Sequence, residues 1–161
     1  MKDRIYNTII HCYSWEELTD AQRALIEDAK AMTRNSYSPY SHFRVGAAVR
    51  LANGTIVRGS NQENAAYPSG LCAERTALFA ANANYPDQAV EALAIACFAE
   101  GRFTEQPGAP CAGCRQVMLE TEHRYGVPMQ VLLYGEKETY VIDSADQLVP
   151  LGFFAEDLPK K

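Results

Sequence analysis

No stretch of this sequence is apolar enough to suggest a membrane span. Its apolar runs fall well short of the eighteen or so residues that a transmembrane helix needs. Residues 1–11 also lack the long apolar segment and the small-residue cleavage site of a secretory signal. We therefore expect a cytoplasmic protein with no membrane partner.

Basic residues are also scarce. The sequence has fifteen lysines and arginines against twenty aspartates and glutamates, which gives a net charge of −5. A protein that neutralises many phosphates needs an excess of positive charge, so a nucleic-acid partner is not expected. The charge balance favours a small molecule as the partner.

Apolar residues are plentiful enough for one buried core. Of the 161 residues, 47% are hydrophobic and 22% are charged, which is typical of a globular protein. Residues 1–18 show no regular periodicity, although they include three aromatic side chains. The sequence predicts an N-terminal extension over residues 1–18 and a single domain over residues 19–161.

Local patterns near the N-terminus predict one helix and one hairpin. A capping-box pattern that starts at Thr19 predicts a helix over about 20–34. The Asn53-Gly54 pair favours a tight turn, because both residue types accept a positive φ. This pair therefore predicts a β-hairpin with strands at 45–51 and 55–59.

The remaining patterns predict an α/β fold with a mixed sheet. Apolar runs predict strands, and helix-like segments begin near residue 72 and at residue 111. The strand–helix–strand order over 90–134 requires a crossover between parallel strands, whereas the hairpin is antiparallel. The three further strands are expected at 90–98, 130–134 and 139–142.

The five cysteines fall into two groups. Their odd number argues against a disulfide framework in a cytoplasmic protein. Cys97 lies in an apolar run, where a free cysteine usually packs as a small hydrophobe, and Cys12 stands alone near the N-terminus. Cys72, Cys111 and Cys114 have chemically suggestive neighbours.

These three cysteines have the pattern of a zinc site. The segments CAER at 72–75 and PCAGC at 110–114 each follow a loop and open a predicted helix, where backbone N–H groups favour negative charge. Three thiolates need a cation, and tetrahedral Zn²⁺ is the commonest one. The three histidines show no ligand spacing with the cysteines, so the fourth position should be open, as in catalytic sites. We expect one Zn²⁺ per chain.

Two alternatives for the cysteines remain open at this point. Cys12 or Cys97 could supply a fourth ligand and make the zinc site structural, although neither lies in a C-x₂-C pair. Cys111 and Cys114 could instead form a redox dithiol, because this spacing at a helix N-terminus lowers a thiol pKa. A redox pair would leave the cluster around Cys72 unexplained.

Glu74 and Arg75 add acid–base chemistry to the metal site. An acidic residue in a first helical turn can be ordinary compensation of the helix dipole, and an exposed arginine can be a solvated salt bridge. Zinc lowers the pKa of bound water from 15.7 to near 7, and a neighbouring carboxylate can then take its proton. Because three thiolates donate much charge to zinc, a hydrogen bond from Arg75 to a thiolate would restore the acidity of the metal.

Four separated motifs resemble the small zinc-dependent cytidine deaminases of pyrimidine salvage. They are NQEN at 61–64, CAER at 72–75, PCAGC at 110–114 and SPYSHFRVGAA at 38–48. The deaminase signature H-x-E followed by P-C-x-x-C matches with a cysteine in place of the histidine. The resemblance spans about residues 37–158 and implies an α/β fold, a three-layer α/β/α sandwich with a five-stranded mixed sheet.

The resemblance assigns the chemistry to the two cysteine motifs. Cys72, Cys111 and Cys114 would hold zinc. Glu74 would carry a proton from the zinc-bound water to the pyrimidine ring nitrogen and then to the departing ammonia. The backbone N–H of Ala73 would bind the ring carbonyl. The implied enzyme is a hydrolase that converts cytidine and deoxycytidine to uridine and deoxyuridine.

The resemblance also implies substrate contacts and an assembly. Asn61 and Glu63 would hold the ribose hydroxyls, and Phe43 would pack against the base. The family suggests a homotetramer in which Tyr67 and Phe153 help to complete the pocket of a neighbouring subunit. The extension over residues 1–18 departs from the family pattern and could alter this assembly.

Other functions stay open on the sequence alone. A deaminase of another small aminopyrimidine, such as blasticidin, would have much the same motifs. A structural zinc-binding module and a nucleic-acid editing enzyme are further alternatives, and the net charge disfavours the second. The sequence leaves open the preference between cytidine and deoxycytidine, and whether Phe153 or Phe154 reaches a neighbour.

Overall fold

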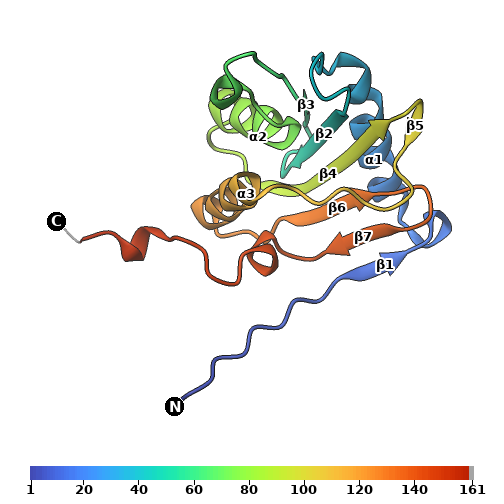
Figure 1. Ribbon diagram of the computed structural model, residues 1–161. Helices are drawn as coiled ribbons and strands as arrows, with labels where there is room; N and C mark the ends of the chain where they lie inside the picture. The colour runs from blue at the N-terminus through green and yellow to red at the C-terminus, as the bar shows by residue number, and fades with distance from the viewer. Residues whose placement is uncertain (160–161) are drawn as a thin grey trace.

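The structure is a computed structural model that describes residues 1–159, and it is built around one mixed β-sheet (Figure 1). The strands lie in the order β1-β7-β6-β4-β2-β3, and β5 pairs with β4. The pair β4–β6 is parallel and the other pairs are antiparallel. The seven strands are β1 (His11–Tyr13), β2 (Arg44–Leu51), β3 (Ile56–Ser60), β4 (Val90–Ala99), β5 (Arg102–Phe103), β6 (Gln130–Tyr134) and β7 (Thr139–Ile142).

The expected mixed sheet is confirmed, but the expected number of five strands is wrong. The two additional strands are β1, which pairs with β7, and β5, which pairs with β4. They are three and two residues long, and such short segments have no measurable periodicity. Because β1 lies within residues 1–18, part of the expected N-terminal extension belongs to the sheet.

Three helices pack on the sheet. They are α1 (Asp20–Met32), α2 (Ala73–Asn84) and α3 (Ala112–Tyr125), and α3 forms the predicted crossover between the parallel strands β4 and β6. The predicted capping box at Thr19 is present, because its side chain accepts from the Gln22 backbone N–H and the Gln22 side chain accepts from the Thr19 N–H. Helix α3 ends at Tyr125 and is capped by Gly126, whose φ of 64° suits glycine.

The helices cover both faces of the sheet. One core contains Ala47 and Val49 of β2 together with residues of α2 and α3, and the other contains Ala48 with residues of α1. Alternate residues of a strand point to opposite faces, so α1 lies on one face and α2 and α3 lie on the other. We call these the α1 face and the α2–α3 face.

Two glycines permit the helices to approach the sheet closely. A Cβ atom at Gly46 in β2 would collide with the backbone of α1 at Ala29, and one at Gly59 in β3 would collide with α2 at Ala73 and Ala77. The N-terminus of α2 is therefore set directly against β3. This close packing determines where the side chains of its first turn lie.

The predicted hairpin is present, but its turn differs from the expected one. The loop closes through the Leu51 N–H to the Thr55 carbonyl at 2.9 Å and the Gly54 N–H to the Leu51 carbonyl at 2.8 Å. Within this loop Gly54 alone has a positive φ, of 82°. The connection is thus longer than a two-residue turn with positive φ at both Asn53 and Gly54.

The two ends of the described chain leave the sheet on the same side (Figure 1). The Thr8 hydroxyl donates to the Gln147 carbonyl at 2.8 Å, and the Ile9 N–H donates to the Gln147 side chain at 3.2 Å. The N-terminal segment therefore contacts the short 3₁₀ helix at Ala145–Leu148, which precedes the C-terminal tail.

The helices within residues 1–159 are all too short or too polar to span a membrane.

Candidate metal centre and substrate pocket

The N-termini of α2 and α3 bring the three cysteines together. Cys72 is the N-cap residue of α2, Cys111 is the N-cap residue of α3, and Cys114 lies in the first turn of α3. Neither N-cap side chain makes a capping hydrogen bond, so both sulfur atoms are available to a ligand. The positive ends of two helix dipoles meet here and favour thiolates.

The sulfur geometry fits a tetrahedral zinc ion. The Sγ atoms of Cys72 and Cys111 are 3.9 Å apart, and those of Cys111 and Cys114 are 3.4 Å apart. All three ligand atoms lie within 4.8 Å of one another. Zn–S bonds of about 2.3 Å in a tetrahedron place sulfurs about 3.8 Å apart, so the three cysteines suit zinc without rearrangement of the backbone.

In the described part of the chain, three cysteines form the cluster. Cys12 lies on β1 and Cys97 is buried on β4, and neither is part of the group. Burial raises the pKa of Cys97 to about 12, so this thiol behaves as a hydrophobe. The structure therefore gives no support to a closed site with a fourth cysteine.

The cysteines differ in their protonation when no metal is bound. The neighbouring Cys114 thiol and a hydrogen bond from Arg75 lower the pKa of Cys72 to about 5, despite its partial burial. The pKa of Cys114 is raised, because it lies beside the Cys72 sulfur and its side chain is buried. Metal binding must then displace protons from the cluster.

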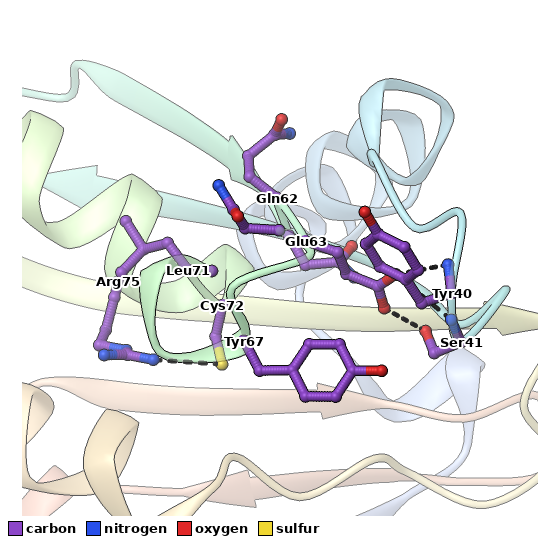
Figure 2. Close-up of a pocket in the computed structure, with 11 residues that line it drawn as sticks. Tyr40, Ser41, Gln62, Glu63, Tyr67, Leu71, Cys72 and Arg75 are labelled. Atoms are coloured by element: carbon purple, nitrogen blue, oxygen red, sulfur yellow. Dashed lines mark hydrogen bonds between the residues drawn. The ribbon is translucent and has the colours of Figure 1, made fainter.

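Arg75 contacts the cluster as expected. Its Nη2 atom donates to the Cys72 sulfur at 3.6 Å, and this contact raises the pKa of the guanidinium (Figure 2). The Arg75 Nε atom is buried and has no hydrogen-bond partner in the described part of the chain. The arginine is thus positioned beside a thiolate and is not a solvated surface charge.

Glu74 is a buried carboxyl group beside the cluster. It lies in the first turn of α2, and only 5% of its surface is exposed. Burial raises its pKa, and the negative charge of Cys72 raises it further. A carboxyl group with a raised pKa is a candidate for general acid–base catalysis.

A pocket of about 500 Å³ opens next to the cluster (Figure 2). Such a volume is typical of small-molecule sites. Of the residues that the sequence assigned to the site, this pocket is lined by Asn61, Glu63, Tyr67, Cys72 and Arg75. In Figure 2, Arg75 lies on one side of Cys72, while Glu63 and Tyr40 lie on the other.

The Glu63 carboxylate is held by the loop that precedes β2. It accepts hydrogen bonds from the Tyr40 N–H at 2.9 Å, from the Ser41 N–H at 3.3 Å and from the Ser41 hydroxyl. These bonds lower the pKa of Glu63 and keep it ionised, and the bond from the Ser41 hydroxyl contributes most. Tyr40 and Ser41 also line the pocket, and both stand in the motif at 38–48 without an assigned role.

Asn61 joins the same loop to the sheet. Its Oδ1 atom accepts from the Ser36 hydroxyl at 2.5 Å and from the Val45 N–H at 2.8 Å. Its Nδ2 atom donates to the Phe43 carbonyl at 2.9 Å. Asn61 therefore orients the loop, and one N–H of its amide remains for a ligand.

The structure does not gather every expected residue in the pocket of one chain. Phe43 does not line it and is 39% exposed. Phe153 is 58% exposed in the C-terminal tail, which the Gln116 side chain holds through the Phe153 backbone at 2.8 and 3.2 Å. Tyr67 lines the pocket yet is 75% exposed, and its ring packs against Tyr40 with 6.1 Å between centroids.

The sequence matches a known family and known relatives. The family model of the cytidine and deoxycytidylate deaminase zinc-binding region matches residues 19–128. A cytidine deaminase of Halalkalibacterium halodurans is 38% identical over 139 residues, which cover 85% of this chain and 97% of the relative. A cytidine deaminase of Sporosarcina psychrophila is 39% identical over 134 residues, with coverage of 83% and 92%.

The fold matches solved structures of the same family. A crystal structure of cytidine deaminase from Burkholderia pseudomallei has a TM-score of 0.70 and 40% sequence identity, and the match covers 84% of this chain and all of that chain. The match of the family model includes both cysteine motifs, and the three sulfur atoms are placed to bind one zinc ion per chain. This protein therefore belongs to the cytidine and deoxycytidylate deaminase family, with Cys72, Cys111 and Cys114 as the cluster that fits its zinc.

Proposed function

We propose that this protein deaminates cytidine and deoxycytidine hydrolytically, and so produces uridine and deoxyuridine with ammonia in pyrimidine salvage. The observation that carries the proposal is a buried Glu74 carboxyl that interacts with Cys72 and Cys114, in a cluster of three thiols of which Cys72 also lines the open pocket. The relatives named above are cytidine deaminases, which supports cytidine as the substrate. A zinc ion held by the three thiolates would supply Lewis acidity and would lower the pKa of a bound water to about 7.

Different residues of the chain carry out different steps of the proposed reaction. The reaction forms a C4–O bond with the oxygen of water and breaks the C4–N bond. One proton must move to ring N3 and one to the leaving amine. Glu74 is the group that takes and delivers these protons, because its pKa is raised and it lies in the first turn of α2. Arg75 withdraws charge from the Cys72 sulfur through its hydrogen bond.

Substrate orientation follows from the same helix and loop. The Ala73 N–H, at the first position of α2, binds the ring carbonyl, because the first N–H groups of a helix have no partner within it. Asn61 and Glu63 bind the ribose hydroxyls, and the hydrogen bonds that hold them fix their positions. Phe43 packs against the base once the substrate is bound.

A homotetramer completes the pocket in this proposal. Tyr67 and Phe153 are large apolar side chains that stay exposed in the single chain, and burial against a neighbour would remove their apolar surface from water. A cytoplasmic location suits the cluster, because the cytoplasm keeps thiols reduced. In this scheme residues 1–18 are an extension of a single catalytic domain at 19–161.

The test measures metal content and ammonia release on the same purified sample. We expect one zinc per chain and release of ammonia from cytidine and deoxycytidine. Faster turnover of blasticidin would instead indicate a deaminase for another aminopyrimidine. Zinc without any deaminase activity would indicate a structural module, and greater activity on single-stranded DNA or RNA would overturn the nucleoside assignment.

A further inference from the structure

A second cavity lies on the α1 face, away from the cysteine cluster. Its volume is about 580 Å³, which is ample for a small organic ligand. Arg44 begins β2 and faces the same side of that strand as Ala48, which packs against α1. The residues that characterise this cavity are Glu27, Lys30, Arg34, Arg44, Phe98 and Phe103.

The charge of this cavity is positive. The Lys30 amine pairs with the Glu27 carboxylate at 2.6 Å, so these two charges cancel locally. Within residues 1–159, neither Arg34 nor Arg44 has an ion pair or a side-chain hydrogen bond. Two exposed guanidinium groups without a protein partner thus line one cavity in a chain whose net charge is −5. A doubly charged anion is the ligand that would satisfy both.

Aromatic side chains lie beside the two arginines. Phe98 and Phe103 are half-buried, and their rings pack edge to face with 5.2 Å between centroids. Arg44 is the cross-strand partner of Phe98 in the β2–β4 pair, so both side chains lie on the same side of the sheet. A ligand that uses the whole cavity would join an anionic group to a flat apolar ring.

We propose that this cavity binds a nucleoside phosphate, with Arg34 and Arg44 on the phosphate and the base packed on Phe98 and Phe103. Guanidinium groups match phosphate oxygens in geometry as well as in charge. The site is separate from the pocket beside Cys72, which is lined by other residues.

The two arginines stand at the two ends of the loop that holds the catalytic pocket. Loop 35–43 connects them, and its Tyr40 and Ser41 bind the Glu63 carboxylate. Near the start of the loop Ser36 binds Asn61, which in turn binds the Phe43 carbonyl at its end. A phosphate that bridges the arginines removes their mutual repulsion and holds the ends of this loop together. This coupling rests on the proposed function, whereas the binding site itself does not.

The first test is calorimetric titration of the zinc-loaded protein with uridine 5′-monophosphate. In the double variant Arg34→Gln/Arg44→Gln, binding should weaken by at least about tenfold, because two charged hydrogen-bonding groups are lost. The matched control is Arg50→Gln. Arg50 lies on β2, as Arg44 does, and its Nε atom already pairs with the Glu91 carboxylate at 3.7 Å. This control should bind as the parent protein does.

Two outcomes would overturn the proposed site. They are unchanged binding in the double variant and displacement of the nucleotide by free uridine from the parent protein. If unchanged binding came with a changed molecular mass of the double variant, the arginines would be a contact between protein chains. Inorganic phosphate should also bind, more weakly, and should lose its binding in the double variant.

The second test asks whether the two sites are coupled. Uridine 5′-monophosphate should shift the KM for cytidine by about fivefold in the parent protein, and the double variant should lose this shift. Loss of nucleotide binding without any change in the KM response would overturn the coupling. If the parent protein released no ammonia from any nucleoside, the function proposed above would fail while the titration would still decide the binding site.

Discussion

On the α2–α3 face of the sheet, the N-termini of two helices converge and three thiols with a buried carboxyl group lie between them. On the α1 face, Leu25, Ile26 and Ala29 of α1 pack across the strands. A helix whose N-terminus lies over a site presents free N–H groups and the positive end of its dipole there. A helix that packs along its length on a sheet presents only side chains. The difference explains why the proposed chemistry belongs to the α2–α3 face.

The α1 face contains a half-buried charge, that of Lys30, with partners in the chain itself. The Lys30 amine lies 5.3, 5.2 and 4.9 Å from the ring centroids of Trp15, Phe103 and Tyr134, and it pairs with Glu27. Its charge is satisfied within the chain. Trp15 belongs to residues 1–18, so this aromatic cage also ties the N-terminal extension to the domain. The comparison separates a charge that is held by contacts of the fold from the charges to which the proposed reaction assigns a role.

Cys114→Ala should have the largest effect, because it removes a buried metal ligand from the α2–α3 face. We expect zinc affinity to fall by more than the roughly 10- to 100-fold that follows loss of an outer partner, with nearly complete loss of turnover. Elemental analysis and ammonia release measure both effects. Cys12→Ser is the control, and it should keep its zinc. Retention of full zinc by Cys114→Ala would show that the cluster is not the metal site.

Glu74→Gln should come next, because it removes the proton carrier and leaves the ligands. Turnover should fall by about 10²- to 10⁴-fold while zinc content and the unfolding temperature stay near those of the parent protein. The control is Glu120→Gln, an exposed glutamate on α3. If Glu74→Gln kept more than half of the parent turnover, another group would have to carry the proton.

Arg75→Ala should have an intermediate effect. The thiolate of Cys72 would lose its donor, so turnover should fall by about 10- to 100-fold in protein that still holds zinc. Arg75→Lys should recover part of the rate, because a lysine keeps the charge but not the planar donor geometry. Equal rates for Arg75→Ala and the parent protein at equal zinc content would reduce the arginine to a structural role.

Lys30→Met should have the smallest effect on catalysis and a measurable effect on stability. Loss of the caged charge should lower the free energy of unfolding by about 1 kcal/mol, as measured by urea unfolding. The matched control is Lys137→Met, whose side chain is 64% exposed in a surface pair with Glu105. A large loss of turnover in Lys30→Met would break the comparison, because it would show that the α1 face takes part in the reaction.

Regular elements could be predicted because their signals are local. The capping box at Thr19 and the run of apolar residues in β4 each act within one segment of chain. The short strands β1 and β5 could not be predicted, since their pairing depends on partners supplied by β7 and β4. The same limit applies to the hairpin turn. The sequence predicted its location correctly but not its conformation.

The site was predictable in its chemistry and only partly in its arrangement. Residue type and spacing identified Cys72, Cys111, Cys114 and Glu74, and the comparisons with known proteins establish the family. The catalytic and binding roles stay predictions for Glu74, Arg75, Asn61, Glu63, Ala73, Phe43, Tyr67 and Phe153. Tyr40 was missed because its backbone, and not its side chain type, holds Glu63.

The sequence by itself determined the kind of chemistry, because ligand atoms, acid–base groups and helix N-termini are properties of residue type and local spacing. Only the tertiary structure decided that Cys72 and Cys111, 39 positions apart, bring their sulfurs to 3.9 Å. It also decided that Arg34 and Arg44 share a cavity on the opposite face. The physical reason is that strand order and helix packing determine which distant segments meet, and no local pattern encodes those meetings.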